Sequence, residues 1–410
     1  MKTGKRPPWA QLFFTSLILC ISLLSCSFWF APDEAEGRSR APKQELLVVH
    51  SLAETLSSLH LGEDGAFLSQ QNDLVRLGAV PNEIISVGYE LAITLSGENR
   101  LLFLDKERLF RRDSIDFGYN VNPMRTAVLN SGTPDPGQSI FATSGLFTSR
   151  IHLYSRAGTD QDIAGAMKTG QSPQAVLVLP DGPNSVRLIV ANTAYSSARP
   201  STNPFGPASL TVFTLSFQEK DNVQLVETQD IDLEKGTHDP DTDPGLNPVA
   251  LVDMELHGET IDEIVVVGSG RNLGSSGMGD DDGTVLVLNR ETLEVIQRIS
   301  VGGSPGAVAV LPLDTGGHVL FLVGTTGIQS ITRSQEKEWS QESTSVYTAQ
   351  GGLPFLSDVV AWHNALYVAD FGRNKILRFR HDGGEELTLV EERSVSDGPI
   401  ALLVRSDTTE

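Results

Sequence analysis

Residues 282–312, DGTVLVLNRETLEVIQRISVGGSPGAVAVLP, contain the repeating unit of this chain. Two short apolar stretches, TVLVLN (284–289) and VIQRIS (295–300), are followed by a Gly–Gly turn, after which Pro305 opens a third stretch. Each stretch has the length and the β-branched composition of a strand. Proline suits the first position of a strand because it has no N–H to donate within a sheet. The segment therefore predicts consecutive strands and no helix.

Strands opened by a proline recur along the whole chain. Their prolines are Pro81, Pro123, Pro173, Pro248, Pro305, Pro354 and Pro399. Between successive prolines lie further strand-like stretches, for example LIVAN (188–192) and LTVFTL (210–215) in one repeat. Four short strands in a repeat of about 45 residues are typical of a propeller blade.

The two ends of the chain supply the last blade. Only 11 residues follow Pro399, enough for one strand, whereas strand-like stretches at 46–51, 55–61 and 72–78 precede Pro81. One C-terminal strand joining three N-terminal strands leaves no open sheet edge at the seam. We therefore expect an all-β, seven-bladed β-propeller over residues 45–410.

The repeats also resemble known families. Residues 282–312 resemble the YVTN family of surface propellers, in which a TV-x-V strand alternates with a VG-x-x-P-x-x-V passage. NALYVADFGRNKILRF (364–379) is similar to the NHL repeat. The resemblance extends over most of residues 45–410 and implies the propeller fold. It does not choose among functions, because such rings host binding, scaffolding and several chemistries.

The N-terminus predicts an extracytoplasmic location. Lys2, Lys5 and Arg6 precede an apolar run over residues 12–30, as in a secretory signal. Leu23-Leu24-Ser25-Cys26 resembles the bacterial lipobox, which implies a signal peptide at 1–25 and a diacylated Cys26. Residues 26–44 have the composition of a flexible tether. An uncleaved signal anchor is the alternative, and both place the body in the bacterial cell envelope, exposed to the periplasm or the cell surface.

Composition excludes some partners. The 410 residues include 52 acidic and 31 basic side chains, for a net charge of -21. Binding to nucleic acid needs clustered Lys and Arg, so nucleic acid is not an expected partner. With 2 Cys, the chain is not a disulfide scaffold.

Long loops in the third and fourth blades are expected on one face of the ring. Residues 192–208 and 268–283 connect second to third strands, and residues 238–245 connect a fourth strand to the next blade. Long loops in a compact repeat are commonly functional. The candidate binding residues in these loops are Tyr195, Arg199, Phe205, Arg271 and Asn272.

Two acidic clusters in the same loops are candidate Ca²⁺ ligands. They are Asp239, Asp241 and Asp243, and Asp280, Asp281 and Asp282. A D-x-D-x-D alternation brings oxygens to one hard cation. The Gly and Glu of an EF-hand are missing, however, and Pro240 and Pro244 constrain the first loop. Solvated turn residues are the favoured interpretation, and no cofactor is firmly predicted.

Polar residues of the first strands are expected to line the central channel: Glu83, Arg125, Gln174, Asp253 and Asp358. Lactonase-like propellers hold a metal there with carboxylate and amide groups. The presence of Arg125 and the lack of His also fit a polar channel with an ion pair. The G-x-S-x-G sequence at 302–306 lies between strands, whereas a nucleophile elbow needs a strand-to-helix turn.

The sequence therefore predicts a lipid-anchored envelope propeller that is a non-catalytic binding or scaffold module for a protein, peptide or glycan. A metal-dependent, lactonase-like or other hydrolase is the main alternative. A Ca²⁺-stabilised structural protein is a third.

Overall fold

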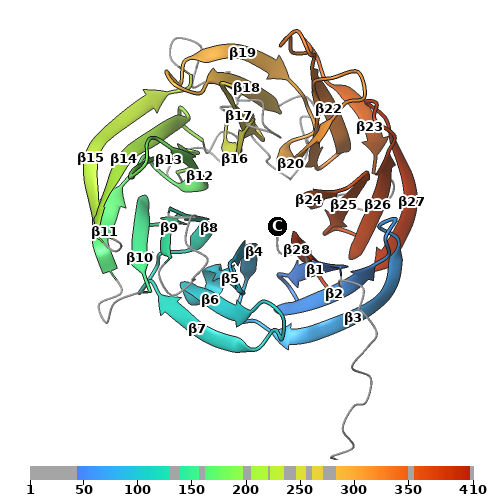
Figure 1. The fold of residues 1–410 in the computed structure, drawn as a ribbon, viewed down its shortest axis with the longest axis horizontal. Helices are drawn as coiled ribbons and strands as arrows, with labels where there is room; N and C mark the ends of the chain where they lie inside the picture. The colour runs from blue at the N-terminus through green and yellow to red at the C-terminus, as the bar shows by residue number, and fades with distance from the viewer. Residues whose placement is uncertain are drawn as a thin grey trace, which may run out of the picture. The chain divides into compact units, whose positions relative to one another are not determined.

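Seven four-stranded antiparallel sheets form a ring of blades (Figure 1). The computed structural model describes residues 44–129, 139–156, 162–196, 205–219, 222–234, 246–254, 261–270, 283–349 and 355–406. The predicted signal peptide, Cys26 and the tether before Gln44 lie outside these residues. Within the described ranges, no helix is long and apolar enough to cross a membrane.

Blades 1 to 4 follow one another along the chain. Blade 1 contains β4 (Pro81–Val87), β5 (Glu90–Leu95), the 3-10 helix η1 (Ser96–Glu98), β6 (Arg100–Asp105) and β7 (Arg111–Asp116). Blade 2 contains β8 (Pro123–Val128), β9 (Ile140–Gly145), β10 (Arg150–Ser155) and β11 (Asp162–Lys168). Blade 3 contains β12 (Pro173–Pro180), β13 (Ser185–Asn192), β14 (Ser209–Glu219) and β15 (Asn222–Asp232). Blade 4 contains β16 (Pro248–Asp253), β17 (Glu263–Gly268), β18 (Thr284–Asn289) and β19 (Val295–Ser300).

The remaining blades complete the ring. Blade 5 contains β20 (Pro305–Pro312), β21 (His318–Gly324), β22 (Gly327–Arg333) and β23 (Thr344–Thr348). Blade 6 contains β24 (Leu356–Trp362), β25 (Ala365–Asp370), β26 (Lys375–His381) and β27 (Leu387–Ser394). Blade 7 combines β28 (Pro399–Ser406) with β1 (Gln44–His50), β2 (Thr55–Leu61) and β3 (Phe67–Arg76).

Blade 7 confirms the predicted closure of the ring. The C-terminal strand β28 pairs antiparallel with β1, and β2 and β3 follow outward. β3 begins at Phe67, before the stretch 72–78 predicted from the sequence. Ser69, Gln70 and Gln71, just before the predicted stretch, are polar and lie at the outer edge, where a strand does not need an apolar period.

Each innermost strand enters the sheet in the same way. Six of the seven begin at the predicted proline, and β24 begins at Leu356, two residues after Pro354. The pairing register with the second strand shifts directly after the first residue in all seven. A shift of this kind is a β-bulge, which bends the strand and redirects its side chains.

The residue before the proline has a positive φ angle in six blades. These residues are Val80, Asn122, Ser172, Asn247, Ser304 and Gly398. In blade 1, the Val80 carbonyl accepts the Ser96 N–H, and the Asn122 and Asn247 carbonyls accept equivalent bonds in their blades. Each of these bonds joins the segment that enters a blade, just before its first strand, to the turn between the second and third strands of the same blade. That face of the ring is therefore a connected platform of loops.

The core lies between neighbouring blades. All residues of β5, β9 and β25 are buried. The innermost strands contact one another in ring order, with β28 between β24 and β4 (Figure 1). Between blades 3 and 4, for example, Leu210 and Leu286 belong to one buried cluster.

Candidate functional site

The third residue of each innermost strand occupies an equivalent position. Four of the seven are alanines: Ala175, Ala250, Ala307 and Ala401. The other three are the predicted channel residues Glu83, Arg125 and Asp358, on β4, β8 and β24. Because β28 lies between β24 and β4, these charges occupy one arc of the ring.

Glu83 and Arg125 form an ion pair between blades 1 and 2. The Arg125 Nη1 atom lies 3.6 Å from Glu83 Oε1, and the Thr126 N–H donates to Glu83 Oε2 at 2.6 Å. The Glu83 side chain is 13% exposed and that of Arg125 is 34% exposed. Burial raises the pKa of Glu83 to about 7, although the Arg125 charge and the Thr126 N–H act in the opposite direction.

Asp358 makes the same kind of contact between blades 6 and 7, two blade interfaces away. Its Oδ2 accepts the backbone N–H of Leu402 at 2.7 Å. Thr126 and Leu402 are both the fourth residue of the next innermost strand. Burial raises the pKa of Asp358 to about 6, again against the Arg125 charge. The two carboxyls thus link neighbouring blades, and the charge of one guanidinium, that of Arg125, acts on both.

The other two predicted channel residues occupy other positions in their strands. Asp253 ends β16, and Arg290 binds its carboxylate through two nitrogens, at 3.1 and 2.9 Å. Ala250 stands at the third position of that strand. Gln174 is the second residue of β12 and lines a groove on the loop face. The hydroxyl of Ser144 donates to the Gln174 carbonyl and accepts the Arg125 N–H, so this groove adjoins the charged arc.

The groove lies between blades 2 and 3 and has a volume of about 560 Å³. Three connections form it: the turn after β9, the segment between β11 and β12, and the loop after β13. Its described lining residues are Leu146, Phe147, Ser149, Gln171, Ser172, Gln174, Tyr195, Ser196 and Phe205. We call this the aromatic groove.

Hydrogen bonds hold the walls of the aromatic groove together. The Ala194 N–H donates to the Gln171 carbonyl at 3.0 Å, and the Ser172 hydroxyl donates to the Tyr195 carbonyl at 3.2 Å. Tyr195 and Phe205 form an isolated β-bridge, and their rings meet edge to face with centroids 5.7 Å apart. The second-to-third loop of blade 3 is therefore anchored at Tyr195 and Phe205.

The rings of the groove face solvent. Phe147 is 58% exposed and Tyr195 is 45% exposed, which is unusual for large side chains in a packed fold. Serine hydroxyls and glutamine amides supply the polar groups, and none of the described lining residues is charged. Such a lining offers stacking faces and neutral hydrogen-bonding groups to a ligand.

The remaining predicted site residues lie outside the described part of the chain. These are Cys26, Arg199, Arg271, Asn272, Asp239, Asp241, Asp243, Asp280, Asp281 and Asp282. Their roles remain predictions. Among the residues that the structure does describe, no group of three His, Cys, Asp or Glu side chains is arranged to hold a metal ion.

Phe147 and Gln171 are groove residues that the sequence analysis did not identify. Phe147 lies in a short turn of ordinary length, and Gln171 lies in a connection without an unusual composition. The available signal was a large aromatic residue in a predicted turn, where glycine or a polar residue is usual.

Among the comparisons with known proteins, only solved structures match, and they support the fold. No protein-family model matches the chain, and no curated protein matches it in sequence. A putative 6-phosphogluconolactonase from Bacteroides fragilis is similar in structure, with 13% identity, 90% of this chain and 99% of that chain covered, and a TM-score of 0.57. AztD from Citrobacter koseri has 10% identity, 90% and 100% coverage, and a TM-score of 0.51. At this level of identity the likeness supports the seven-bladed propeller alone.

Proposed function

We propose that this propeller is a non-catalytic binding module of the bacterial cell envelope that holds a neutral glycan in the aromatic groove. The basic N-terminus, the apolar run and the lipobox-like sequence at Cys26 support anchoring through an N-terminal lipid. The YVTN-like repeat supports a surface or envelope role. The groove supports the binding role and its ligand class.

The lining of the aromatic groove is the observation that carries the proposal. Sugar rings present apolar C–H faces and many hydroxyls. Exposed rings such as Phe147 and Tyr195 bury such faces, while the amides of Gln171 and Gln174 pair with hydroxyls. A charged ligand would find no opposite charge among the described lining residues and would lose its hydration, so a neutral ligand is favoured.

A glycan fits this groove better than a peptide strand does. A peptide that adds to a sheet needs unpaired backbone N–H and C=O groups along an edge. At the groove wall, the N–H groups of Thr193 and Ala194 already donate to the Ser172 and Gln171 carbonyls. Recognition therefore depends on side chains.

The binding role is tested with the detergent-solubilised full chain. Short oligomers of glucose and of N-acetylglucosamine are titrated into the protein by calorimetry. We expect Phe147→Ala and Tyr195→Ala each to weaken binding about 10-fold or more, equivalent to ~1.4 kcal/mol. Tyr119→Ala is the control, since Tyr119 is 95% exposed and does not line the groove. Absence of oligosaccharide binding, or an equal loss in the Tyr119 variant, contradicts the glycan assignment.

The anchoring role is tested separately by cell fractionation. Cys26→Ala removes the predicted lipid attachment site and should move the protein from the membrane to the soluble fraction. Unchanged membrane association would count against the lipoprotein assignment and leave the groove experiment unaffected.

A hydrolase is the second candidate, and the raised pKa values of Glu83 and Asp358 favour it. A carboxyl that titrates near neutral pH suits general acid–base chemistry. The residues present do not fit a metal, because the Arg125 guanidinium pairs with Glu83 and each carboxylate accepts a backbone N–H. An activity that uses these two carboxyls would therefore be metal-independent. Lactone hydrolysis that is lost in Glu83→Gln would support this candidate.

A further inference from the structure

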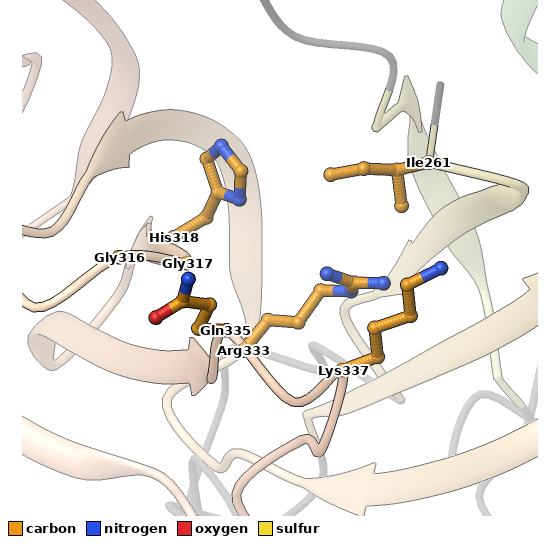
Figure 2. A pocket seen from close by; sticks show the side chains of 7 residues that line it. All are labelled: Ile261, Gly316, Gly317, His318, Arg333, Gln335 and Lys337. Carbon is orange, nitrogen blue, oxygen red and sulfur yellow. The ribbon is translucent and has the colours of Figure 1, made fainter. Parts of the chain in front are cut away.

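A second cavity lies on the opposite face of the ring, between blades 4 and 5. Its volume is about 410 Å³. It is formed by the turn between β20 and β21, the turn between β22 and β23, and Ile261 before β17. The described lining residues are Ile261, Gly316, Gly317, His318, Arg333, Gln335 and Lys337 (Figure 2). We call it the basic pocket.

The side chains of the basic pocket converge on one space. Figure 2 shows the charged ends of Arg333 and Lys337 extending toward it, with Ile261 opposite and His318 and Gln335 to one side. None of the described lining residues is acidic. Cationic groups gathered in a hollow are unexpected in a chain whose net charge is -21.

Arg333 is fixed in place by neighbouring groups. Its Nε lies 2.6 Å from Glu263 Oε2, and the same oxygen accepts the Trp339 Nε1–H at 3.1 Å. Arg333 is 4% exposed, and its backbone lies opposite that of His318 at the end of the β21–β22 ladder. A guanidinium held by a carboxylate is preorganised, so little side-chain entropy is lost when its remaining edge binds a ligand.

The two turns bring the other groups to the pocket. Gly316 and Gly317 have φ angles of 82° and 86°, and a Cβ at Gly317 would lie 2.1 Å from the Arg333 carbonyl oxygen. Glycine is therefore required where the first turn approaches the end of β22. Lys337 has a φ angle of 70°, and its N–H donates to the Ser334 carbonyl, which closes the second turn.

We propose that the basic pocket binds the phosphate group of a small molecule. Glu263 balances the charge of Arg333, and Lys337 adds a further positive charge, so the pocket as a whole favours an anion. An ammonium beside a guanidinium suits the several oxygens of a phosphate. Ile261 supplies an apolar wall for the carbon part of the ligand.

Inorganic phosphate is the probe, titrated by calorimetry into the full chain at constant ionic strength. We expect a Kd below about 1 mM. Lys337→Gln should weaken binding about 10-fold, and the isosteric Gln335→Glu should abolish it by placing a carboxylate on the pocket wall. Both residues are exposed, so neither change threatens the fold.

Lys106→Gln is the matched control. Lys106 lies in the third-to-fourth turn of blade 1, the turn equivalent to that of Lys337, and does not line the pocket. Its removal changes the net charge equally and should leave phosphate binding unchanged. The proposal is overturned if the wild type shows no binding, if the Lys106 and Lys337 variants lose affinity equally, or if acetate binds as tightly as phosphate. Oligosaccharide binding in the aromatic groove is independent of each result.

Discussion

At the residue scale, the identity of the third residue of each innermost strand distinguishes one arc of the ring from the other. Alanine at four positions places only a methyl group there, whereas Glu83, Arg125 and Asp358 place ionisable groups. The carboxylates of Glu83 and Asp358 accept N–H groups of the next blade. They therefore contribute to blade packing as well as to the charge of this arc.

The raised pKa of Glu83 makes stability depend on pH. Its pKa is about 7 in the folded protein, against an ordinary value of 4.5. Between these values the folded state holds the proton more tightly than the unfolded state, so the free energy of unfolding falls as the pH rises through this window. At about 1.4 kcal/mol per pKa unit, the loss is at most about 3 kcal/mol.

Glu83→Gln should remove this dependence, because the amide cannot ionise and its oxygen still accepts the Thr126 N–H. We expect the free energy of unfolding of the variant minus that of the wild type to be about 2 kcal/mol larger at pH 8 than at pH 5. Urea unfolding at the two pH values measures this difference. Glu386→Gln, at an exposed carboxylate, is the control and should show no such change. An equal pH slope in the wild type and the Glu83 variant would show that Glu83 is not the titrating group.

At the element scale, the entry into the innermost strand is the feature that the blades share. The residue before the proline has a left-handed φ angle, and the register shifts just after the first strand residue. Asn, Ser and Gly occupy this position in five blades, and Val occupies it in blade 1. A β-branched residue in the left-handed region is strained, since its Cβ lies close to the following carbonyl oxygen.

Val80→Gly should therefore stabilise the protein, by about 1 kcal/mol, because release of the strain exceeds the entropy lost by glycine. Val295→Gly is the matched control: Val295 is 43% exposed and Val80 is 44% exposed, but Val295 lies within strand β19. There the same change should destabilise by about 1 kcal/mol. Urea unfolding compares the two variants. Destabilisation of both would indicate that Val80 is not strained.

The sequence predicted the blades well because their strands are decided by local chemistry. Proline at the first position and short β-branched runs depend on neighbouring residues alone, so β18 was predicted to the residue. The bulge after each proline depends on the pairing partner, which the sequence does not display. For this reason Asp253 was grouped with Glu83 although it lies at the other end of its strand.

The site was less predictable than the fold. The sequence predicted Tyr195 and Phe205 as binding residues because their loop is long. Phe147 is identified only in the structure, where three connections from two blades form the groove. The basic pocket joins residues from two turns of blade 5 to Ile261 in blade 4. Arg333 and Lys337 stand among acidic residues in the sequence, so their convergence depends on the three-dimensional arrangement.

At the scale of the whole molecule, the ring is held closed where the strands β1 and β28 meet. Glu45 on β1 and Arg405 on β28 form a buried ion pair, and the second Glu45 oxygen lies 3.1 Å from His60 Nδ1. Arg405 also donates to the carbonyls of Lys106 and Glu107 in the β6–β7 turn of blade 1. One side chain thus connects β1 and β28 to the neighbouring blade.

Arg405→Met should lower the free energy of unfolding, since it leaves the Glu45 carboxylate buried without its guanidinium partner. Loss of one partner of a buried pair costs about 3–5 kcal/mol, whereas replacement of both by apolar residues is often neutral. The double variant Glu45→Leu/Arg405→Met should therefore recover most of the stability lost in the single variant. Urea unfolding of the full chain measures all the variants.

An exposed pair provides the contrast. Arg380 and Asp382 form an ion pair with side chains 55% and 65% exposed, so Arg380→Met should change stability by less than about 1 kcal/mol. Equal effects of the Arg380 and Arg405 substitutions would show that the closure does not depend on the buried pair. A double variant as unstable as Arg405→Met would instead assign the stabilisation to the bonds that Arg405 makes with blade 1. The two results thus separate pairing within blade 7 from its attachment to the next blade.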